Sequence, residues 1–349
     1  MNEQQLLDAY TAGRRAFQNL EFPAVNLSGI HLSQANFDHS DFTDGSLARS
    51  DLSYCRFNGA QLQKASLYGT NLSYAKLAQC NLFQADLTKA NLQGASLNYA
   101  NLQQAQLSGA ILHWVSFYNA QLQQVNFCGA NLRGINLRGA DLTEANLSWT
   151  NLSEAKLSGA ILDKADLSGA RLNKSYLNAL DLSGRDFSGL NLTEVAFNGG
   201  KCNEAVLIGA NLTGSQLRLT AFVRTNFKQA YLNNCDLHKA DLSYANCEQV
   251  EAIAARFSNA KLIQANFAGA TLRDAHFDGA NLQGADFRGA DLQGANFVDA
   301  DLSNTCLDGA NLQGAIFIRS SAVQPVTPRS FGLFDLARSD NFLRNYSVS

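Results

Sequence analysis

The 349-residue sequence lacks the features that mark several large classes of protein. No apolar run approaches the roughly 18 residues of a membrane-spanning helix, and residues 1–20 lack the basic stretch and apolar core of a signal peptide. The 27 basic and 30 acidic residues nearly cancel, which argues against binding to nucleic acid through its phosphates. The seven cysteines are odd in number and form no CxxC pair, as is typical of reduced thiols. These absences predict a cytoplasmic protein that contacts neither a membrane nor nucleic acid directly.

What the sequence does contain is a period of five residues. From Leu27 to Phe317, nearly every residue whose number ends in 2 or 7 is Leu or Phe, and we call this the centre position. The residue two before each centre is small or medium-sized, as at Ala60 and Ala65. A helix would spread such centres around its circumference, and a long strand would send them to alternate faces. A short extended segment followed by a corner fits, and four such sides make a square coil of about 20 residues that stacks on the next.

Glycine supports the corners of this coil. Of the 26 glycines, 22 fall at numbers ending in 4 or 9, the second residue after the centre. A type II turn needs a positive φ there, which glycine adopts without steric cost. In the C-terminal third, Phe and Leu alternate at successive centres from Phe257 to Phe297, which predicts that Phe fills one opposed pair of sides and Leu the other.

The segments ANLQGADFRGADLQGANF (280–297) and ADLTEANLSWTNLSEAKL (140–157) resemble the tandem pentapeptide-repeat family, with its pattern A(D/N)LXX. The resemblance implies an all-β fold, a right-handed quadrilateral β-helix of about 15 square coils with short helical caps. Its handedness comes from the resemblance alone. We expect an N-terminal helical cap over residues 1–25, the β-helix over 26–320 and a C-terminal cap or tail over 321–349.

The two ends differ from the repeat. Residues 3–17 predict a short amphipathic helix with Leu6, Tyr10 and Phe17 on one side, which would cover the first coil. The string from Tyr10 to Gln18 resembles the start of cyanobacterial members of the family, among them a regulator of heterocyst differentiation that acts by binding regulatory proteins. Between Phe331 and Leu343 an apolar set predicts either a cap over the last coil or a segment for homodimerisation or partner binding.

Two segments depart from the pattern within the repeat. At 180–202, Arg185 takes an inward position, where a charge is costly unless it is paired or reaches solvent. At 247–252, Cys247 and Ala252 replace the usual large centres. We expect locally relaxed coils in both segments.

No pattern for catalysis appears in the sequence. The five histidines fall on several columns without acidic or cysteine neighbours at ligand spacing, and there is no glycine-rich phosphate loop, GxSxG or HExxH. We therefore predict no enzyme, no catalytic or metal-binding residues and no cofactor.

One surface of the predicted coil is rich in aromatic residues. Residues twenty apart share a column, so Tyr54, Tyr74 and Trp114 lie at one corner. Aromatic residues beside Arg are typical of protein-binding hot spots, although aromatic residues on a β surface also stack on one another for stability. The predicted protein-interaction surface consists of Tyr54, Arg56, Tyr74, Lys76, Tyr99, Ile111, His113, Trp114 and Tyr118.

These observations favour a non-enzymatic protein-interaction rod, with a regulatory role in a cyanobacterium that the resemblance ties to heterocyst differentiation or signalling. Its partner would be another protein, a regulator. The alternative is a DNA mimic that inhibits a type II topoisomerase (gyrase), as the resemblance to the quinolone-resistance group implies. Between Asp274 and Asp308 there are seven Asp and one Arg, but these acidic residues fall on different columns.

Overall fold

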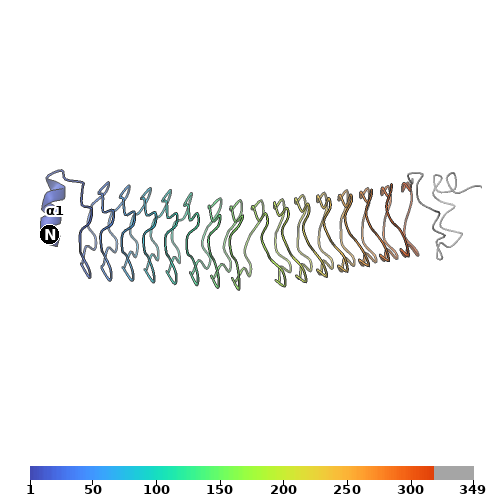
Figure 1. The fold of residues 1–349 in the computed structure, drawn as a ribbon, viewed down its shortest axis with the longest axis horizontal. Helices are drawn as coiled ribbons and strands as arrows, with labels where there is room; N and C mark the ends of the chain where they lie inside the picture. Colours follow the sequence, from blue (N-terminus) through green and yellow to red (C-terminus); the bar gives the residue numbers. More distant parts are fainter. Residues whose placement is uncertain (318–349) are drawn as a thin grey trace, which may run out of the picture. The chain divides into compact units, whose positions relative to one another are not determined.

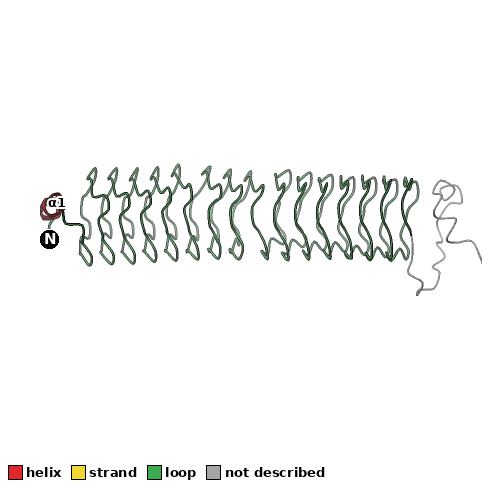
Figure 2. Ribbon diagram, turned by 90° about the horizontal axis from the view of Figure 1, so that it is seen from above, coloured by secondary structure: helices red, strands yellow, loops and turns green. Residues whose placement is uncertain are grey.

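The computed structural model describes residues 1–317, and the chain divides into two compact units, residues 1–176 and 177–349. Unit 1 begins with helix α1 (Glu3–Thr11), and both units consist of coils that stack side by side (Figure 1). Neighbouring coils are joined by isolated parallel bridges between residues twenty apart, such as Asn71 with Asn91. Because each bridge is a single pair, residues 1–317 contain no longer strand, and Figure 2 draws the coils as loops.

The bridges confirm the predicted period. A bridge occurs at every fifth residue at the start of the ladder, from Ala16 and Glu21 to Asn26 and His31, so each coil of twenty residues has four sides. Each bridge is closed by backbone hydrogen bonds, as between Leu72 N and Asn91 O at 2.7 Å. Because this pairing repeats along each unit, residues twenty apart line up in columns that run across the coils.

The core consists of the centres and the small residues two before them, as predicted. Leu72 and Leu92 are fully buried, and Ala75 and Ala95 are 1% exposed. From Phe257 onward the phenylalanines form two stacked columns: Phe257 and Phe277 have centroids 4.9 Å apart, and Phe267 and Phe287 are 5.1 Å apart. The two columns meet edge to face, with 82° between the rings of Phe257 and Phe267. This confirms that Phe fills one opposed pair of sides.

Every corner has the predicted backbone conformation. From Asn19 to Gly314, each fifth residue has a positive φ between 51° and 73°. The carbonyl of the centre accepts from the N–H three residues later, as between Ala75 N and Leu72 O at 3.1 Å, which matches a type II turn. Many of these positions hold Tyr, Trp, Lys or Gln instead of Gly, and the surrounding ladder holds them there. The corner side chains consequently point outward at regular intervals.

Helix α1 is shorter than the predicted helix over 3–17. It starts at a capping box between Asn2 and Gln5 and ends at Thr11, because Gly13 turns the chain with a φ of 95°. Ala16 already pairs with Asn36 in the first coil. Leu6 of α1 is fully buried. The boundaries at 25/26 and 320/321 stay predictions, and the apolar set between Phe331 and Leu343 lies outside the described residues.

The two irregular segments behave differently. At 247–252 the expectation of a relaxed coil is wrong: Cys247 and Ala252 are fully buried, and their N–H groups donate to Asn266 and Thr271 at 2.7 and 2.8 Å. A small centre does not disturb the coil there, because the backbone ladder fixes the spacing. At 180–202, by contrast, the inward positions Arg185 and Leu190 are only half-buried.

Candidate protein-interaction surface

The predicted surface lies wholly in unit 1, on one side of the coils and the two corners that flank it, with Ile111 just beyond the first corner; we call this side and its two corners the aromatic face. At the first corner the rings of Tyr54 and Tyr74 stack at 5.1 Å with 13° between their planes. A Cβ at Gly94, the next residue of the column, would lie 2.6 Å from the Tyr74 ring. Tyr74 therefore rests on the backbone of the next coil, and these two tyrosines stabilise the column as well as cover it.

Trp114 completes this column but is placed differently. Its side chain is 71% exposed, although Gly134 follows it in the column as Gly94 follows Tyr74. No atom lies within 4 Å of the position that a Cβ of Gly134 would take, so the indole does not rest on the next coil. His113 is also exposed, and Ile111, on the other side of this corner, is 45% exposed. Trp114 is thus a large apolar group with little packing of its own.

The second corner has the other two tyrosines. The rings of Tyr99 and Tyr118 meet edge to face at 5.6 Å, and both are exposed. On the side between the corners, Arg56 and Lys76 are bridge partners on neighbouring coils, and Arg56 forms an ion pair with Asp38 at 2.8 Å. The structure therefore brings eight of the nine predicted residues onto one face of unit 1, and Ile111 lies on the adjoining side, just before the first corner.

The backbone ladder opens beside Trp114, which the sequence analysis did not foresee. At most corners of unit 1 the N–H of the corner residue donates to the coil that follows, as from Tyr74 to Gln93 at 2.7 Å, but none is found for Gly109, the corner just before Trp114. In unit 1 no backbone acceptor is found for the N–H groups of Leu112 and Trp114, although the centre and corner of the preceding coil, Leu92 and Gly94, are bonded normally. The coils are joined again at Phe117, whose N–H donates at 2.8 Å.

The inward residues next to this corner explain the opening. Val115 and Ile135 are buried, and they follow one another in a column whose other members in unit 1 include Ala75, Ala95 and Ala155. Two β-branched side chains stacked where Ala normally sits need more room than the usual coil spacing gives. The sequence does contain this signal, as two successive large residues at the small position.

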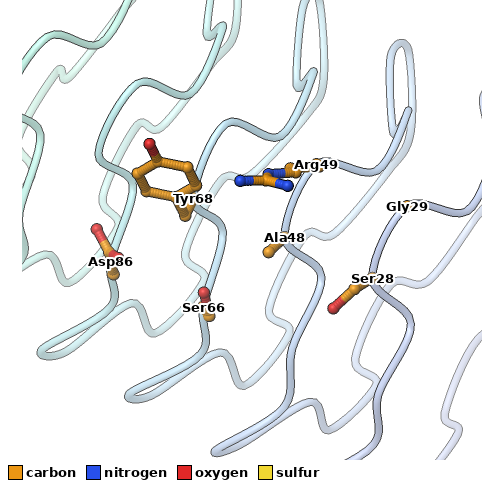
Figure 3. A pocket seen from close by; sticks show the side chains of 7 residues that line it. All are labelled: Ser28, Gly29, Ala48, Arg49, Ser66, Tyr68 and Asp86. Atoms are coloured by element: carbon orange, nitrogen blue, oxygen red, sulfur yellow. The ribbon is translucent and has the colours of Figure 1, made fainter.

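A shallow depression of about 610 Å³ lies on the opposite side of unit 1 (Figure 3). Arg49 faces the ring of Tyr68 at 5.9 Å, and Lys89 approaches the same ring at 5.7 Å. Arg49, Gly69, Lys89 and Gly109 follow one another in one column, twenty residues apart, so the alternation is visible in the sequence. The two glycines leave room for the aliphatic parts of the Arg49 and Lys89 side chains. The lining residues are Ser28, Gly29, Ala48, Arg49, Ser66, Tyr68 and Asp86.

The acidic segment near the end of unit 2 is partly neutralised. Asp286 forms an ion pair with Arg288, whose hydrogen bond lowers the pKa of the carboxyl group, and Asp291 pairs with Arg273. These two carboxylates therefore do not offer free negative charge in the way that phosphates do.

The described residues contain no group of three or more His, Cys, Asp or Glu side chains that could hold a metal ion. All seven cysteines are free, and burial raises the pKa of Cys55, Cys202 and Cys235 to about 12. Thiols with such pKa values stay protonated and unreactive at neutral pH. Among residues 1–317 no helix is both long and apolar enough to span a membrane.

Comparison with known proteins places this architecture in a family. The family described as "Pentapeptide repeats" matches in a succession of segments between residues 22 and 323. HetL, a pentapeptide repeat protein involved in heterocyst differentiation regulation from the cyanobacterium Nostoc sp. strain PCC 7120, is 23% identical over 91% of this chain and 97% of its own, with a TM-score of 0.19. QnrB1, a plasmid-mediated fluoroquinolone resistance protein, is 18% identical over 54% of this chain and 81% of its own, with a TM-score of 0.22.

A pentapeptide repeat protein from the thylakoid lumen of Arabidopsis thaliana is 31% identical over 36% of this chain and 69% of its own, with a TM-score of 0.14. No curated protein matches the chain. At such TM-scores the three solved structures add nothing about function. The family matches recur along most of the coils, in step with the five-residue period that builds them, and the chain therefore belongs to the pentapeptide-repeat family.

Proposed function

We propose that this protein is a non-enzymatic, regulatory binding protein of the cytoplasm, built as a right-handed quadrilateral β-helix, and that the aromatic face is its contact surface. The observation that carries the proposal is Trp114, which is 71% exposed and does not pack on the coil that follows it. Large aromatic side chains of this kind dominate the energetics of protein interfaces.

The rest of the aromatic face supports this role. Tyr54 and Tyr99 are 56% and 52% exposed, and they flank a side whose outward residues include Arg56 and Lys76. Aromatic and Arg side chains together are the composition enriched in interface hot spots. A rigid ladder holds them, so a partner would bind with little ordering cost on this side.

Co-purification with partners from a lysate of the source organism tests the proposal. The full-length protein is compared with Tyr74→Ala/Trp114→Ala and with a matched control, Tyr68→Ala/Trp149→Ala, on the opposite side of the same unit. We expect a regulator to be recovered with the wild type and with the control, and to be lost with the first variant. If the Tyr74→Ala/Trp114→Ala variant retains the partner undiminished, the aromatic face is not the contact surface.

The same experiment separates this function from DNA mimicry. DNA mimicry predicts that topoisomerase subunits are recovered and that the wild type and the Tyr74→Ala/Trp114→Ala variant inhibit gyrase supercoiling equally. That result would favour the acidic segment between Asp274 and Asp308 as the contact surface. A role in heterocyst differentiation is the most specific part of the proposal and rests on the string from Tyr10 to Gln18. It requires that the recovered partner be a regulator of that process.

A further inference from the structure

The aromatic face has an excess of positive charge on a protein whose net charge is −3. Within residues 33–159, the outward positions of this side and its two corners hold five basic and two acidic residues. Both acidic residues are paired with basic ones: Asp38 with Arg56, and Glu154 with Arg133, each at 2.8 Å. Of the five basic residues of the aromatic face, three form no ion pair within unit 1: Lys76, Arg138 and Lys156.

The arrangement of these charges costs stability in the free protein. Arg56 and Lys76 are direct bridge partners, and like charges opposite one another on neighbouring strands repel. The single carboxylate near them, Asp38, is bonded to Arg56 through Nε and Nη2 and also accepts from the N–H of Asn58. It has little capacity left for Lys76, so the repulsion is not relieved within the face.

The opposite side of the same coils is a control within the molecule. Within residues 43–169, the corresponding outward positions hold four basic and five acidic residues, so the opposite side has no excess of positive charge. The basic residues on that side are Arg49, Lys64, Lys89 and Lys164, and the acidic ones are Asp44, Asp86, Glu144, Asp163 and Asp166. A general bias toward basic surface residues therefore does not explain the face.

We infer that the partner of the aromatic face is an acidic protein segment whose apolar side chains contact Trp114 and whose carboxylates meet Lys76, Arg138 and Lys156. This inference rests on the proposed function and names the chemistry of the partner. From Lys76 to Lys156 the face advances by four coils, about 19 Å at the usual spacing of neighbouring strands, so the carboxylates are spread along an extended segment or a helix of several turns. Charge complementarity of this kind accelerates binding and selects against basic partners.

Selection from a random-peptide phage library tests the inference without knowledge of the natural partner. The full-length protein is the target, and synthetic copies of the enriched peptides are titrated by fluorescence anisotropy. Three forms are compared: the wild type, the triple variant Lys76→Glu/Arg138→Glu/Lys156→Glu, and the matched triple variant Arg49→Glu/Lys64→Glu/Lys89→Glu on the opposite side. Circular dichroism confirms that all three forms are folded.

We expect the enriched peptides to carry net negative charge together with apolar residues. Charge reversal on the aromatic face should weaken the affinity for these peptides at least tenfold, whereas the affinity of the opposite-side triple variant should stay within about twofold of the wild type. Raising the salt from about 0.05 M to about 0.3 M should weaken binding to the wild type about fivefold. Enriched peptides that are neutral or basic, or equal losses in both triple variants, would overturn the inference.

A fourth protein form separates this inference from the proposed function. One outcome is that the enriched peptides bind the wild type but not Tyr74→Ala/Trp114→Ala and yet show no acidic bias. This result would keep the aromatic face as the binding surface and refute only the acidic partner. Acidic peptides that bind this double variant as tightly as the wild type would refute the aromatic face itself. A selection that enriches no peptide would count against both.

Discussion

The two tryptophans of unit 1 occupy equivalent corners and behave differently. Trp114 and Trp149 are 71% and 72% exposed, and each is followed in its column by a glycine, Gly134 and Gly169. A Cβ at Gly169 would lie 2.6 Å from the indole of Trp149, whereas the space at Gly134 is empty. Trp149 therefore packs on the coil that follows it, whereas the indole of Trp114 does not rest on the following coil. Exposed fraction alone does not distinguish the two.

The inward neighbours of the two corners account for the difference. Trp149 is followed by Thr150, with Ala170 next in that column, and its N–H donates to Ser168 at 2.8 Å. Trp114 is followed by Val115 and lies where the ladder is open. When the backbones of two coils separate, the side chain on one of them no longer has the next coil to rest on. The comparison shows that large residues in the core of a repeat protein can free a side chain at the corner beside them.

The largest expected effect comes from breaking the framework that both corners share. Leu152, the centre that follows the Trp149 corner, is fully buried, and Leu152→Lys would bury an unpaired charge. We expect a loss of about 3–5 kcal/mol in the free energy of unfolding, measured by chemical denaturation. Leu152→Met, the control, should cost less than about 1.5 kcal/mol. A Lys variant as stable as the wild type would show that the centres do not point inward.

Removing each indole in turn tests the comparison directly. With an enriched peptide as ligand, we expect Trp114→Ala to weaken binding about thirtyfold and Trp149→Ala to leave it unchanged, because only the first indole lies on the aromatic face. Stability should respond in the opposite order: about 1 kcal/mol lost for Trp149→Ala and less than about 0.5 kcal/mol for Trp114→Ala. Equal effects of the two changes, in titration and in denaturation, would remove the distinction between the corners.

Hydrogen exchange measures the opening of the ladder. The amides of Leu112 and Trp114 have no backbone acceptor in unit 1, whereas those of Leu147 and Trp149 are bonded at 2.8 Å. We expect the first pair to exchange at least about tenfold faster in native-state exchange followed by NMR, because no hydrogen bond has to open. Similar protection of both pairs would contradict an open corner.

Relieving the crowding should close the open corner. In Val115→Ala/Ile135→Ala, the column would hold Ala as it does elsewhere, and we expect the amides of Leu112 and Trp114 to become protected. The indole of Trp114 would then rest on Gly134, and peptide binding should weaken about threefold because the indole would have to leave this contact to turn toward a ligand. A closed ladder with unchanged binding would show that exposure of Trp114 does not depend on the opening.

The smallest effect concerns the thiols. Burial raises the pKa of Cys55, Cys202 and Cys235 to about 12, so below pH 9 iodoacetamide should modify the exposed Cys128 far faster than these three. Cys128 lies one coil before Ser148, beside the Trp149 corner. A peptide bound to the aromatic face should therefore leave its alkylation rate, followed by mass spectrometry, unchanged. Protection of Cys128 would place the peptide on the wrong side.

The same pKa values set a limit on alkaline stability. An unfolded thiol ionises near pH 9, whereas these buried thiols remain protonated until about pH 12. The stability that they contribute is thus fully present below pH 9 and falls as the pH rises toward 12, because only the unfolded state releases its protons there.

Much of the candidate surface could be predicted because the repeat makes sequence distance equivalent to spatial distance. Twenty residues advance the chain by one coil, so the stacked rings of Tyr54 and Tyr74 and the neighbouring Arg56 and Lys76 follow from their numbers. The end of α1 at Thr11 could not be fixed in this way, since Leu6, Tyr10 and Phe17 fit one helix face equally well without the first coil present.

The sequence by itself determined the period, the inward and outward positions, the corners and the columns, because each of these depends on residues within one or two coils. The tertiary structure alone decided which tryptophan is free. Trp114 and Trp149 have the same local pattern, each with a glycine twenty residues later. Their difference arises from how closely neighbouring coils approach, which Val115 and Ile135 set by their volume once they are stacked in the core.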